Sequence, residues 1–239
     1  MIKVGVVGAG GRMGTETCRA VQAEPGLELV ARVSRGVPLE VLTEAAAEVA
    51  VDFTVPSAVA ANAAWYLDHG LHAVIGTTGL TDDDVADLDR RARAAERGCL
   101  IAPNFALGAV LMMRFAQQAA SHFERAEIVE RHHERKLDAP SGTALRTARL
   151  MAEARAEPFE QTPDGGARGL QVAGVRIHSL RLPGSVAHQE VVFGGAGETL
   201  TIRHDSLDRS AFMPGVLLAI RRVAQLKGAV VGLEHLLEL

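Results

Sequence analysis

The sequence is short of cysteine, of aromatic residues and of long apolar runs without charge. Cys18 and Cys99 are the only cysteines among 239 residues, and their spacing fits neither a zinc site nor a redox pair. Two buried thiols in a reducing cytoplasm are therefore the expected arrangement. No uncharged apolar run is long enough to span a bilayer, and no signal-peptide pattern precedes the first predicted strand. We expect a cytoplasmic protein with no membrane partner.

Neither sign of charge dominates the chain. The sequence has 25 Lys and Arg against 29 Asp and Glu, a formal net charge of -4, so nothing in its composition favours nucleic acid or an anionic membrane surface as a partner. Its histidines and cysteines do not occur at metal-ligand spacing, and no metal site is expected. With 48% hydrophobic residues and 24 glycines, the composition is typical of an α/β protein of one large or two small domains.

A glycine-rich turn follows the first predicted strand, Ile2–Val7, and precedes a predicted helix. Gly8, Gly11 and Gly14 have the spacing Gly-x-x-Gly-x-x-Gly, whereas the commonest form would need glycine at Met13. A strand, a glycine turn and a helix in this order are typical of dinucleotide binding, because the helix N-terminus can then approach a pyrophosphate closely. A tight turn that binds nothing is the alternative.

The end of the second predicted strand, Leu27–Val33, bears on the choice of cofactor. An acidic residue there would bind the ribose hydroxyls of NAD, but the strand is followed by Ser34 and Arg35. A hydroxyl and a guanidinium suit a 2′-phosphate, which favours NADPH over NADH without excluding NADH. In the alternative interpretation, Arg32 and Arg35 are simply exposed.

Strand–helix units repeat through the first hundred residues. Their alternation predicts a parallel, doubly wound sheet, which binds ligands in the loops at the carboxyl ends of its strands. The loops Gly76–Gly79 and Pro103–Phe105 occupy such positions. The predicted strands are 49–54, 72–75 and 99–102, and the predicted helices are 36–48, 57–69 with Ser57 as its cap, and 81–97.

The second half of the chain has a different pattern. A long helix over 106–123 is followed by an edge-like strand over 126–130 and a helix over 143–157. Predicted strands at 175–182, 187–193 and 198–204 are separated by turns at 183–184 and 194–197, as in consecutive hairpins of an antiparallel sheet. The loop at 162–169 is either a lid or a plain connection.

The expected fold is therefore α/β. Its N-terminal part is a Rossmann-like, doubly wound parallel sheet, and its C-terminal part is an α+β domain with a mixed or antiparallel sheet. We place the dinucleotide-binding domain at 1–103, completed by helices at about 210–239, and a second domain at 104–209.

The most distinctive stretch runs from His132 to Ala144. His132 and Lys136 are four residues apart, so they share a face in either a strand or a helix, whereas His133 would point away from a metal shared with His132. A proton donor beside a fixed positive charge suits an anionic substrate. Ser141 is a candidate helix cap and Gly142 would open the helix N-terminus to a carboxylate or phosphate. A solvated charge cluster before an ordinary cap is the alternative.

Together with the glycine turn and the loops at 76–79 and 102–105, this stretch makes the chain similar to the 4-hydroxy-tetrahydrodipicolinate (dihydrodipicolinate) reductase family. The similarity covers essentially the whole length, and the pattern His-His-x-x-Lys-x-Asp-Ala-Pro-Ser-Gly-Thr-Ala is highly specific. It implies an NADPH- or NADH-dependent oxidoreductase of diaminopimelate and L-lysine biosynthesis. It also implies a homotetramer that is built through the sheets of the second domain. The same domain would bind the dicarboxylate substrate.

The resemblance also implies roles for individual residues. His132 and Lys136 would be the catalytic acid/base and proton donor, and His133, Ser141, Gly142 and Thr143 would hold substrate carboxylates. Ser34 stands where many relatives carry an acidic residue, so NADPH is expected to be preferred. The segment 35–51 is shorter than in some relatives, as expected for a trimmed loop. The residues expected to bind the cofactor are Gly8, Ala9, Gly10, Gly11, Arg12, Met13, Ser34, Arg35, Gly76, Thr77, Thr78, Ala102, Pro103, Asn104 and Phe105.

The expected reaction combines loss of the substrate hydroxyl as water, hydride transfer from the nicotinamide, and protonation, with domain closure uniting cofactor and acid. Two other functions stay open. One is a two-domain NAD(P)-dependent dehydrogenase acting on an amino acid. The other is a non-catalytic sensor that binds NADP without turnover.

Overall fold

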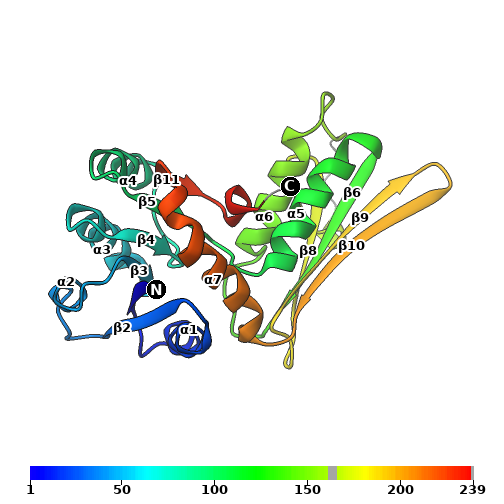
Figure 1. Ribbon diagram of the computed structural model, residues 1–239. Coiled ribbons are helices and arrows are strands. Elements are labelled where there is room, and N and C mark those ends of the chain that lie inside the picture. The colour runs from blue at the N-terminus through cyan, green and yellow to red at the C-terminus, as the bar shows by residue number, and fades with distance from the viewer. Residues whose placement is uncertain (161–165, 238–239) are drawn as a thin grey trace. The chain divides into compact units, whose positions relative to one another are not determined.

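The computed structural model describes residues 1–160 and 166–237 (Figure 1). The chain forms two compact units, Met1–Phe105 with Phe212–Leu239, and Ala106–Ala211. The predicted fold class, a Rossmann-like parallel sheet followed by a second, mixed sheet, is confirmed. No helix within the two described stretches is long and apolar enough to cross a membrane.

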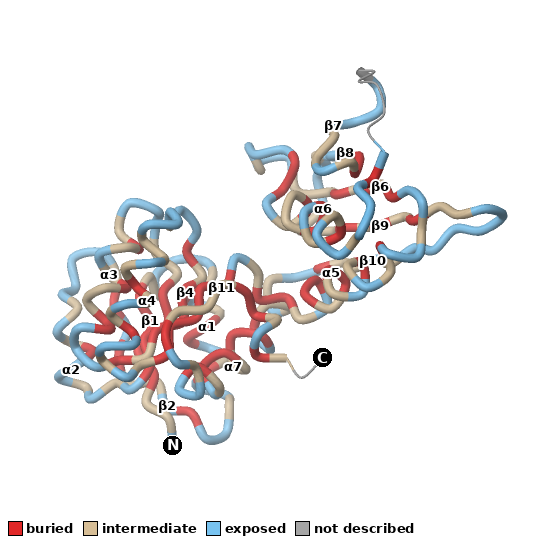
Figure 2. Tube along the Cα trace, turned by 90° about the horizontal axis from the view of Figure 1, so that it is seen from above, coloured by how far each residue is buried: buried red, intermediate tan, exposed pale blue. Residues whose placement is uncertain are grey.

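The first unit is built on a six-stranded sheet with the order β11-β5-β4-β3-β1-β2, in which all neighbouring strands are parallel. Its inner strands are short and apolar, as expected when helices cover both faces, and Figure 2 shows β1 and β4 as largely buried. The strands are β1 (Ile2–Val7), β2 (Leu27–Val33), β3 (Val49–Asp52), β4 (His72–Ile75), β5 (Gly98–Ile101) and β11 (Gly228–Val231).

Helices pack against this sheet in pairs, α1 beside α7 and α3 beside α4 (Figure 1). The helices are α1 (Arg12–Ala23), α2 (Glu40–Glu44), α3 (Pro56–Asp68), α4 (Asp82–Ala94) and α7 (Met213–Arg222), and the 3-10 turns near the C-terminal segment are η3 (Arg209–Phe212), η4 (Val223–Gln225) and η5 (Leu233–Leu236). Both cysteines are buried and free, and burial raises the pKa of the Cys99 thiol to about 12.

Several predicted boundaries in this unit are wrong for local reasons. Helix α2 covers five residues of the predicted 36–48 because the chain first turns at Gly36, whose φ is +86°. Helix α3 is capped by Val55 rather than Ser57, and Pro56 occupies its first turn, where a missing N–H does no harm. The helices predicted at about 210–239 are interrupted: the chain forms η3, α7, η4 and η5, and strand β11, which was not predicted, lies between η4 and η5.

Helix α4 forms where its termini predict it. Thr81 Oγ1 accepts a hydrogen bond from the Asp84 N–H at 3.2 Å, and the Asp84 carboxylate accepts one from the Thr81 N–H at 2.8 Å, which is a capping box. Three aspartates lie in its first turn and Arg91 and Arg93 in its last, as the helix dipole favours.

The second unit contains a five-stranded sheet with the order β10-β9-β6-β8-β7. Strand β6 is central, parallel to β8 and antiparallel to β9, so the prediction of an edge strand at 126–130 is wrong. The predicted hairpin between 175–182 and 187–193 is also wrong, because β6 lies between them. The strands are β6 (Arg125–His132), β7 (Leu170–Val172), β8 (Val175–Arg181), β9 (Ala187–Gly195) and β10 (Glu198–Ser206).

Helices α5 (Leu107–Ala119) and α6 (Gly142–Glu153) lie on one face of this sheet (Figure 1). The turn η1 (Ala120–His122) extends α5, and η2 (Gly166–Arg168) precedes β7. The core on this face contains Ile128, Val191 and Phe193 from the sheet and Ala148 and Met151 from α6. Residues 162–165 of the predicted loop at 162–169 lie outside the described residues.

Candidate active site

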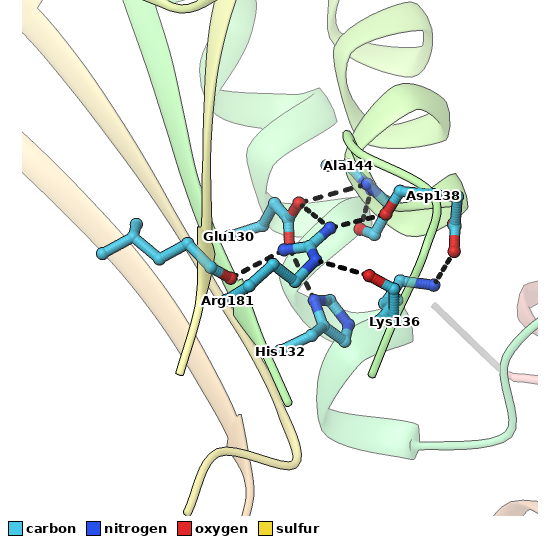
Figure 3. A network of polar contacts seen from close by, with 8 residues as sticks. Glu130, His132, Lys136, Asp138, Ala144 and Arg181 are labelled. Atoms are coloured by element: carbon cyan, nitrogen blue, oxygen red, sulfur yellow. Dashed lines mark hydrogen bonds and ion pairs between the residues drawn. The ribbon is translucent and has the colours of Figure 1, made fainter. Parts of the chain in front are cut away.

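Strand β6 carries two polar side chains onto the helix-facing side of the second sheet. Because side chains alternate along a strand, Glu130 and His132 follow the core residue Ile128 on the same face. Glu130 is fully buried, while the His132 side chain keeps 15% of its surface exposed. The Nδ1 atom of His132 lies 2.5 Å from Oε2 of Glu130 (Figure 3). A buried carboxylate therefore holds the imidazole ring at the end of the strand.

Arg181 completes this pair from the neighbouring strand. The parallel pairing of β6 with β8 sets Arg181 opposite His132. Its two terminal nitrogens donate to the two oxygens of Glu130 at 2.9 and 3.0 Å. The same guanidinium donates to the carbonyl oxygens of Asp138 at 2.6 Å and Lys136 at 3.3 Å (Figure 3). Arg181 thus ties the loop after β6 to the sheet.

The charge of Glu130 is fixed by these contacts. Burial opposes its ionisation, but hydrogen bonds from His132, Arg181 and Ser179 outweigh that effect and lower the pKa of Glu130 to about 2. The carboxylate is therefore ionised at any pH near neutrality. Such a carboxylate accepts the N–H of the ring nitrogen that it contacts and so fixes the orientation of the imidazole.

Lys136 reaches this cluster by a route that periodicity does not describe. The strand ends at His132 and the chain turns, with the Lys136 N–H donating to the His133 carbonyl at 3.1 Å. The face shared by His132 and Lys136 in a regular strand or helix is therefore absent. Figure 3 shows both residues beside Arg181, with the Lys136 ammonium 2.8 Å from Oδ1 of Asp138.

The N-terminus of α6 lies at the same end of the second sheet. Ser141 is its N-cap, as predicted: Oγ accepts from the Ala144 N–H at 3.2 Å, and the Ser141 N–H donates to Glu130 at 3.3 Å. A side chain built on Gly142 would meet nothing within 4 Å, and the first turn contains no acidic residue. These amides and the helix dipole suit an anion. Thr143, in this turn, and His133 are half-buried.

In the first unit, the glycine turn has the shape that a dinucleotide requires. Gly8 has a φ of +81°, and a Cβ on it would lie 2.2 Å from the Phe53 carbonyl oxygen. A Cβ on Gly14 would lie 2.1 Å from the Gly8 carbonyl oxygen. Helix α1 begins after Gly11 with no side-chain cap and no acid in its first turn, so its first N–H groups are left for a ligand. The residues present therefore fit a bound pyrophosphate.

The other predicted cofactor residues lie at the carboxyl ends of the parallel strands, where ligands of such sheets bind. The loop Gly76–Gly79 follows β4, and Ala102–Phe105 follows β5, whose end is joined to β4 by the Ala102 N–H donating to the Ile75 carbonyl. Thr78 is exposed, and Thr77 is buried. At the end of β2, the Ser34 Oγ lies 3.2 Å from the position of a Cβ on Gly10, and Arg35 is exposed.

Two family descriptions cover nearly the whole chain. "Dihydrodipicolinate reductase, N-terminus" matches residues 2–105, and "Dihydrodipicolinate reductase, C-terminus" matches residues 108–237. The chain belongs to the dihydrodipicolinate reductase family.

Named relatives and a solved structure agree over the full length. The chain is 55% identical to the 4-hydroxy-tetrahydrodipicolinate reductase of Nocardia farcinica, covering 100% of this chain and 99% of that protein. It is 53% identical to the one from Streptomyces griseus, covering 100% and 98%. The structure of a dipicolinate-bound dihydrodipicolinate reductase from Paenisporosarcina sp. TG-14 matches with a TM-score of 0.88 and 39% identity, covering 99% of this chain and 100% of that one.

Within this dihydrodipicolinate reductase fold, sequence reasoning missed Glu130, Arg181 and Asp138. Glu130 left a signal, because it stands two residues before His132 on the apolar side of a strand. Arg181 left no signal in the sequence, since its contact with Glu130 depends on the pairing of β6 with β8, which was not predicted. Among the described residues, no group of three or more His, Cys, Asp and Glu side chains could hold a metal ion.

Proposed function

We propose that this chain catalyses the NAD(P)H-dependent reduction of 4-hydroxy-tetrahydrodipicolinate to tetrahydrodipicolinate, a step of diaminopimelate and L-lysine biosynthesis in the cytoplasm. Membership of the dihydrodipicolinate reductase family supports an oxidoreductase with a nicotinamide cofactor. The observation that carries the proposal is the contact of His132 with the buried, ionised Glu130 beside the open N-terminus of α6. That arrangement offers a proton donor next to a site for a carboxylate.

The substrate is a cyclic dicarboxylate, so the first task of the chain is to hold two negative charges. We assign one carboxylate to the amides at the start of α6, with Ser141, Gly142, Thr143 and His133 around it. The open space over Gly142 supports this assignment, because a ligand can reach the backbone there. Lys136 supplies a fixed positive charge, and its ion pair with Asp138 holds its ammonium group.

The second task is to supply a proton. Loss of the 4-hydroxyl as water leaves a conjugated imine, and reduction of its far carbon shifts electron density toward the ring nitrogen as an enamine. A proton from the enzyme quenches that charge and completes the product. We assign this proton to His132 rather than Lys136, because Glu130 orients the ring through Nδ1 and leaves Nε2 to face the substrate.

The cofactor supplies the hydride when it is bound. We assign its pyrophosphate to the turn Gly8–Met13 and its nicotinamide half to the loops Gly76–Thr78 and Ala102–Phe105. Ser34 and Arg35 would bind a 2′-phosphate, so we propose that NADPH is preferred and NADH is also used. The exposed Arg35 and the position of Ser34 over Gly10 support that preference.

These assignments give each unit one role. The unit of Met1–Phe105 and Phe212–Leu239 would carry the cofactor, and the unit of Ala106–Ala211 would carry the substrate and the proton donor. Catalysis then requires the two ligands to meet, and we propose that domain closure brings them together. A role of the loop at 162–169 as a lid stays a prediction, with a plain connection as the alternative.

We further propose a homotetramer assembled through the second sheet. The face opposite α5 and α6 is lined in part by Val129, His178 and Val192, which surround a concavity of about 510 Å³. On the same face, Leu180 is 39% exposed. An uncovered sheet face that carries apolar side chains among paired charges is a suitable surface for another copy of the chain.

Two rival functions make different predictions. An amino-acid dehydrogenase of the same architecture would oxidise or form an amino acid and would not reduce the cyclic imine. An NADP-binding sensor would bind cofactor without substrate-dependent turnover. The Glu130–His132 pair disfavours the sensor, since a sensor needs no proton donor aimed at a second ligand.

The deciding experiment is a coupled assay that generates fresh hydroxy-tetrahydrodipicolinate and follows oxidation of NADPH and NADH in parallel. We expect oxidation that depends on the substrate, with a lower KM for NADPH. In His132→Ala and Lys136→Ala, turnover should fall about 10²- to 10⁴-fold while NADPH affinity is kept. No oxidation by folded protein with either cofactor would refute the function, and equal KM values would refute only the cofactor preference.

A further inference from the structure

Strand β3 ends in a buried carboxylate that the proposed reaction does not use. Asp52 follows three apolar residues of the strand and has no exposed surface. Burying a charge is unfavourable unless it is well hydrogen-bonded, and the Asp52 side chain accepts five hydrogen bonds. It accepts from Thr54 N–H (2.9 Å) and Oγ1 (2.6 Å), Thr77 Oγ1 (2.7 Å), Asn62 Nδ2 (3.1 Å) and Tyr66 OH (2.7 Å).

The two oxygens of Asp52 serve different neighbours. Oδ2 receives the Asn62 and Tyr66 donors, both from α3. Oδ1 receives the donors of Thr54, in the loop after β3, and of Thr77, in the loop after β4. The Thr54 N–H also lies 2.7 Å from Thr77 Oγ1. Asp52 thereby fixes two loops to each other and fastens them to a helix.

The next residue, Phe53, touches all three loops assigned to the cofactor. Its carbonyl oxygen occupies the space that a side chain on Gly8 would need. Its ring occupies the same space at Gly76, where a Cβ would lie 2.1 Å from Cε1 of Phe53. The ring also packs edge to face on Phe105, with ring centroids 5.7 Å apart.

We infer that Asp52 and Phe53 are the positioning residues of the cofactor site. Asp52 sets the segment that follows β3 and the hydroxyl of Thr77, and Phe53 then sets the spacing of the glycine turn, the loop after β4 and the loop after β5. The inference rests on the proposed cofactor role of these loops. Fixed supports of this kind keep a binding site in its productive geometry.

The test is a direct titration of the full chain with NADPH, in the absence of substrate, for wild type and Asp52→Leu. Leucine is of similar size but accepts no hydrogen bond, so the donors of Thr54 and Thr77 lose their shared acceptor and at least one loop must shift. We expect the Kd for NADPH to rise about 10- to 100-fold, as for supporting residues of other preorganised sites. Tyr66→Phe is the matched control, because it removes a donor only from the α3 side; it should lower the Tm and leave the Kd unchanged.

A second pair of variants decides the matter if Asp52→Leu does not fold. Thr54→Ser keeps the hydroxyl that donates to Asp52 and should bind NADPH like wild type, whereas Thr54→Val should bind it weakly. Wild-type Kd values in Asp52→Leu or in Thr54→Val would overturn the inference and leave Asp52 a purely structural group. Absence of NADPH binding by wild type would instead refute the proposed function.

Discussion

Glu127 and Glu130 lie on the same strand and face opposite sides of the sheet, and each contacts one histidine and one arginine. Glu127 is about one-third exposed and pairs with His178 at 2.7 Å and Arg168 at 2.6 Å. Glu130 is fully buried and makes the equivalent contacts with His132 and Arg181. Water screens the first set, while the second acts in a medium of low dielectric constant. The buried carboxylate therefore holds its histidine without competition from water.

Replacing Glu130 with glutamine should therefore affect catalysis. We expect Glu130→Gln to reduce kcat about 10- to 100-fold, the usual effect of removing a group that orients a catalytic side chain. Glu127→Gln is the matched control and should keep the wild-type kcat. A wild-type kcat in Glu130→Gln would show that Glu130 does not position the proton donor.

The same variant has a second readout in acid. The pKa of Glu130 is lowered from its ordinary 4.5 to about 2 in the folded chain, so its contribution to stability is complete above about pH 4.5 and is lost as the pH falls toward 2. The free energy of unfolding measured in urea should therefore fall more over this pH interval for wild type than for Glu130→Gln. If the unfolding free energies of the two proteins changed equally with pH, Glu130 would not be the ionised carboxylate that we assign.

Among individual residues, the sequence was sufficient to predict side chains whose roles follow from a local pattern. Ser141 was predicted as a cap from its place before a helix, and it is one. Asp52 was missed because its five donors come from Thr54, α3 and the loop after β4, and no spacing along the chain reports such a convergence.

Five of the six strands of the first sheet were predictable for a similar reason. Each of these short apolar runs is bounded by glycine, proline or a helix cap and forms a strand, and α4 follows its capping box. The second sheet was harder, since the pairing of strands depends on non-local contacts. A Pro-Gly turn between β8 and β9 looked like a hairpin, but β6 pairs with both. This error concealed the contact of Arg181 with Glu130.

The junction between β1 and α1 offers an element-scale prediction. A Cβ on Gly14 would meet backbone, the Gly8 carbonyl oxygen, at 2.1 Å, so Gly14→Ala must push α1 away from the turn. We expect a loss of about 1–3 kcal/mol in unfolding free energy, typical of overpacking, together with weaker NADPH binding. Gly194→Ala is the control, because its Cβ would meet nothing within 4 Å. Stability and Kd equal to wild type in Gly14→Ala would contradict the rigid turn.

On the scale of the whole molecule, the open face of the second sheet makes the proposed assembly testable. Leu180 lies on that face, opposite Arg131 in the pairing of β6 with β8. Sedimentation velocity should find four chains in the wild-type particle and smaller particles in Leu180→Asp, because a buried unpaired charge opposes association. Leu207→Asp, at a side chain that is 79% exposed in the loop after β10, should leave the particle unchanged. A monomeric wild type, or a tetrameric Leu180→Asp, would contradict the proposed interface.

The order of the strands also bears on synthesis. Strand β5 ends at Ile101, and its outer neighbour β11 begins at Gly228. While a ribosome makes the intervening segment, which contains the complete second sheet, one edge of β5 has no partner. Exposed strand edges readily pair with other chains, and domains generally fold as units while the chain emerges. We therefore expect the period before residues 228–231 appear to be the one in which the nascent chain is most prone to aggregate.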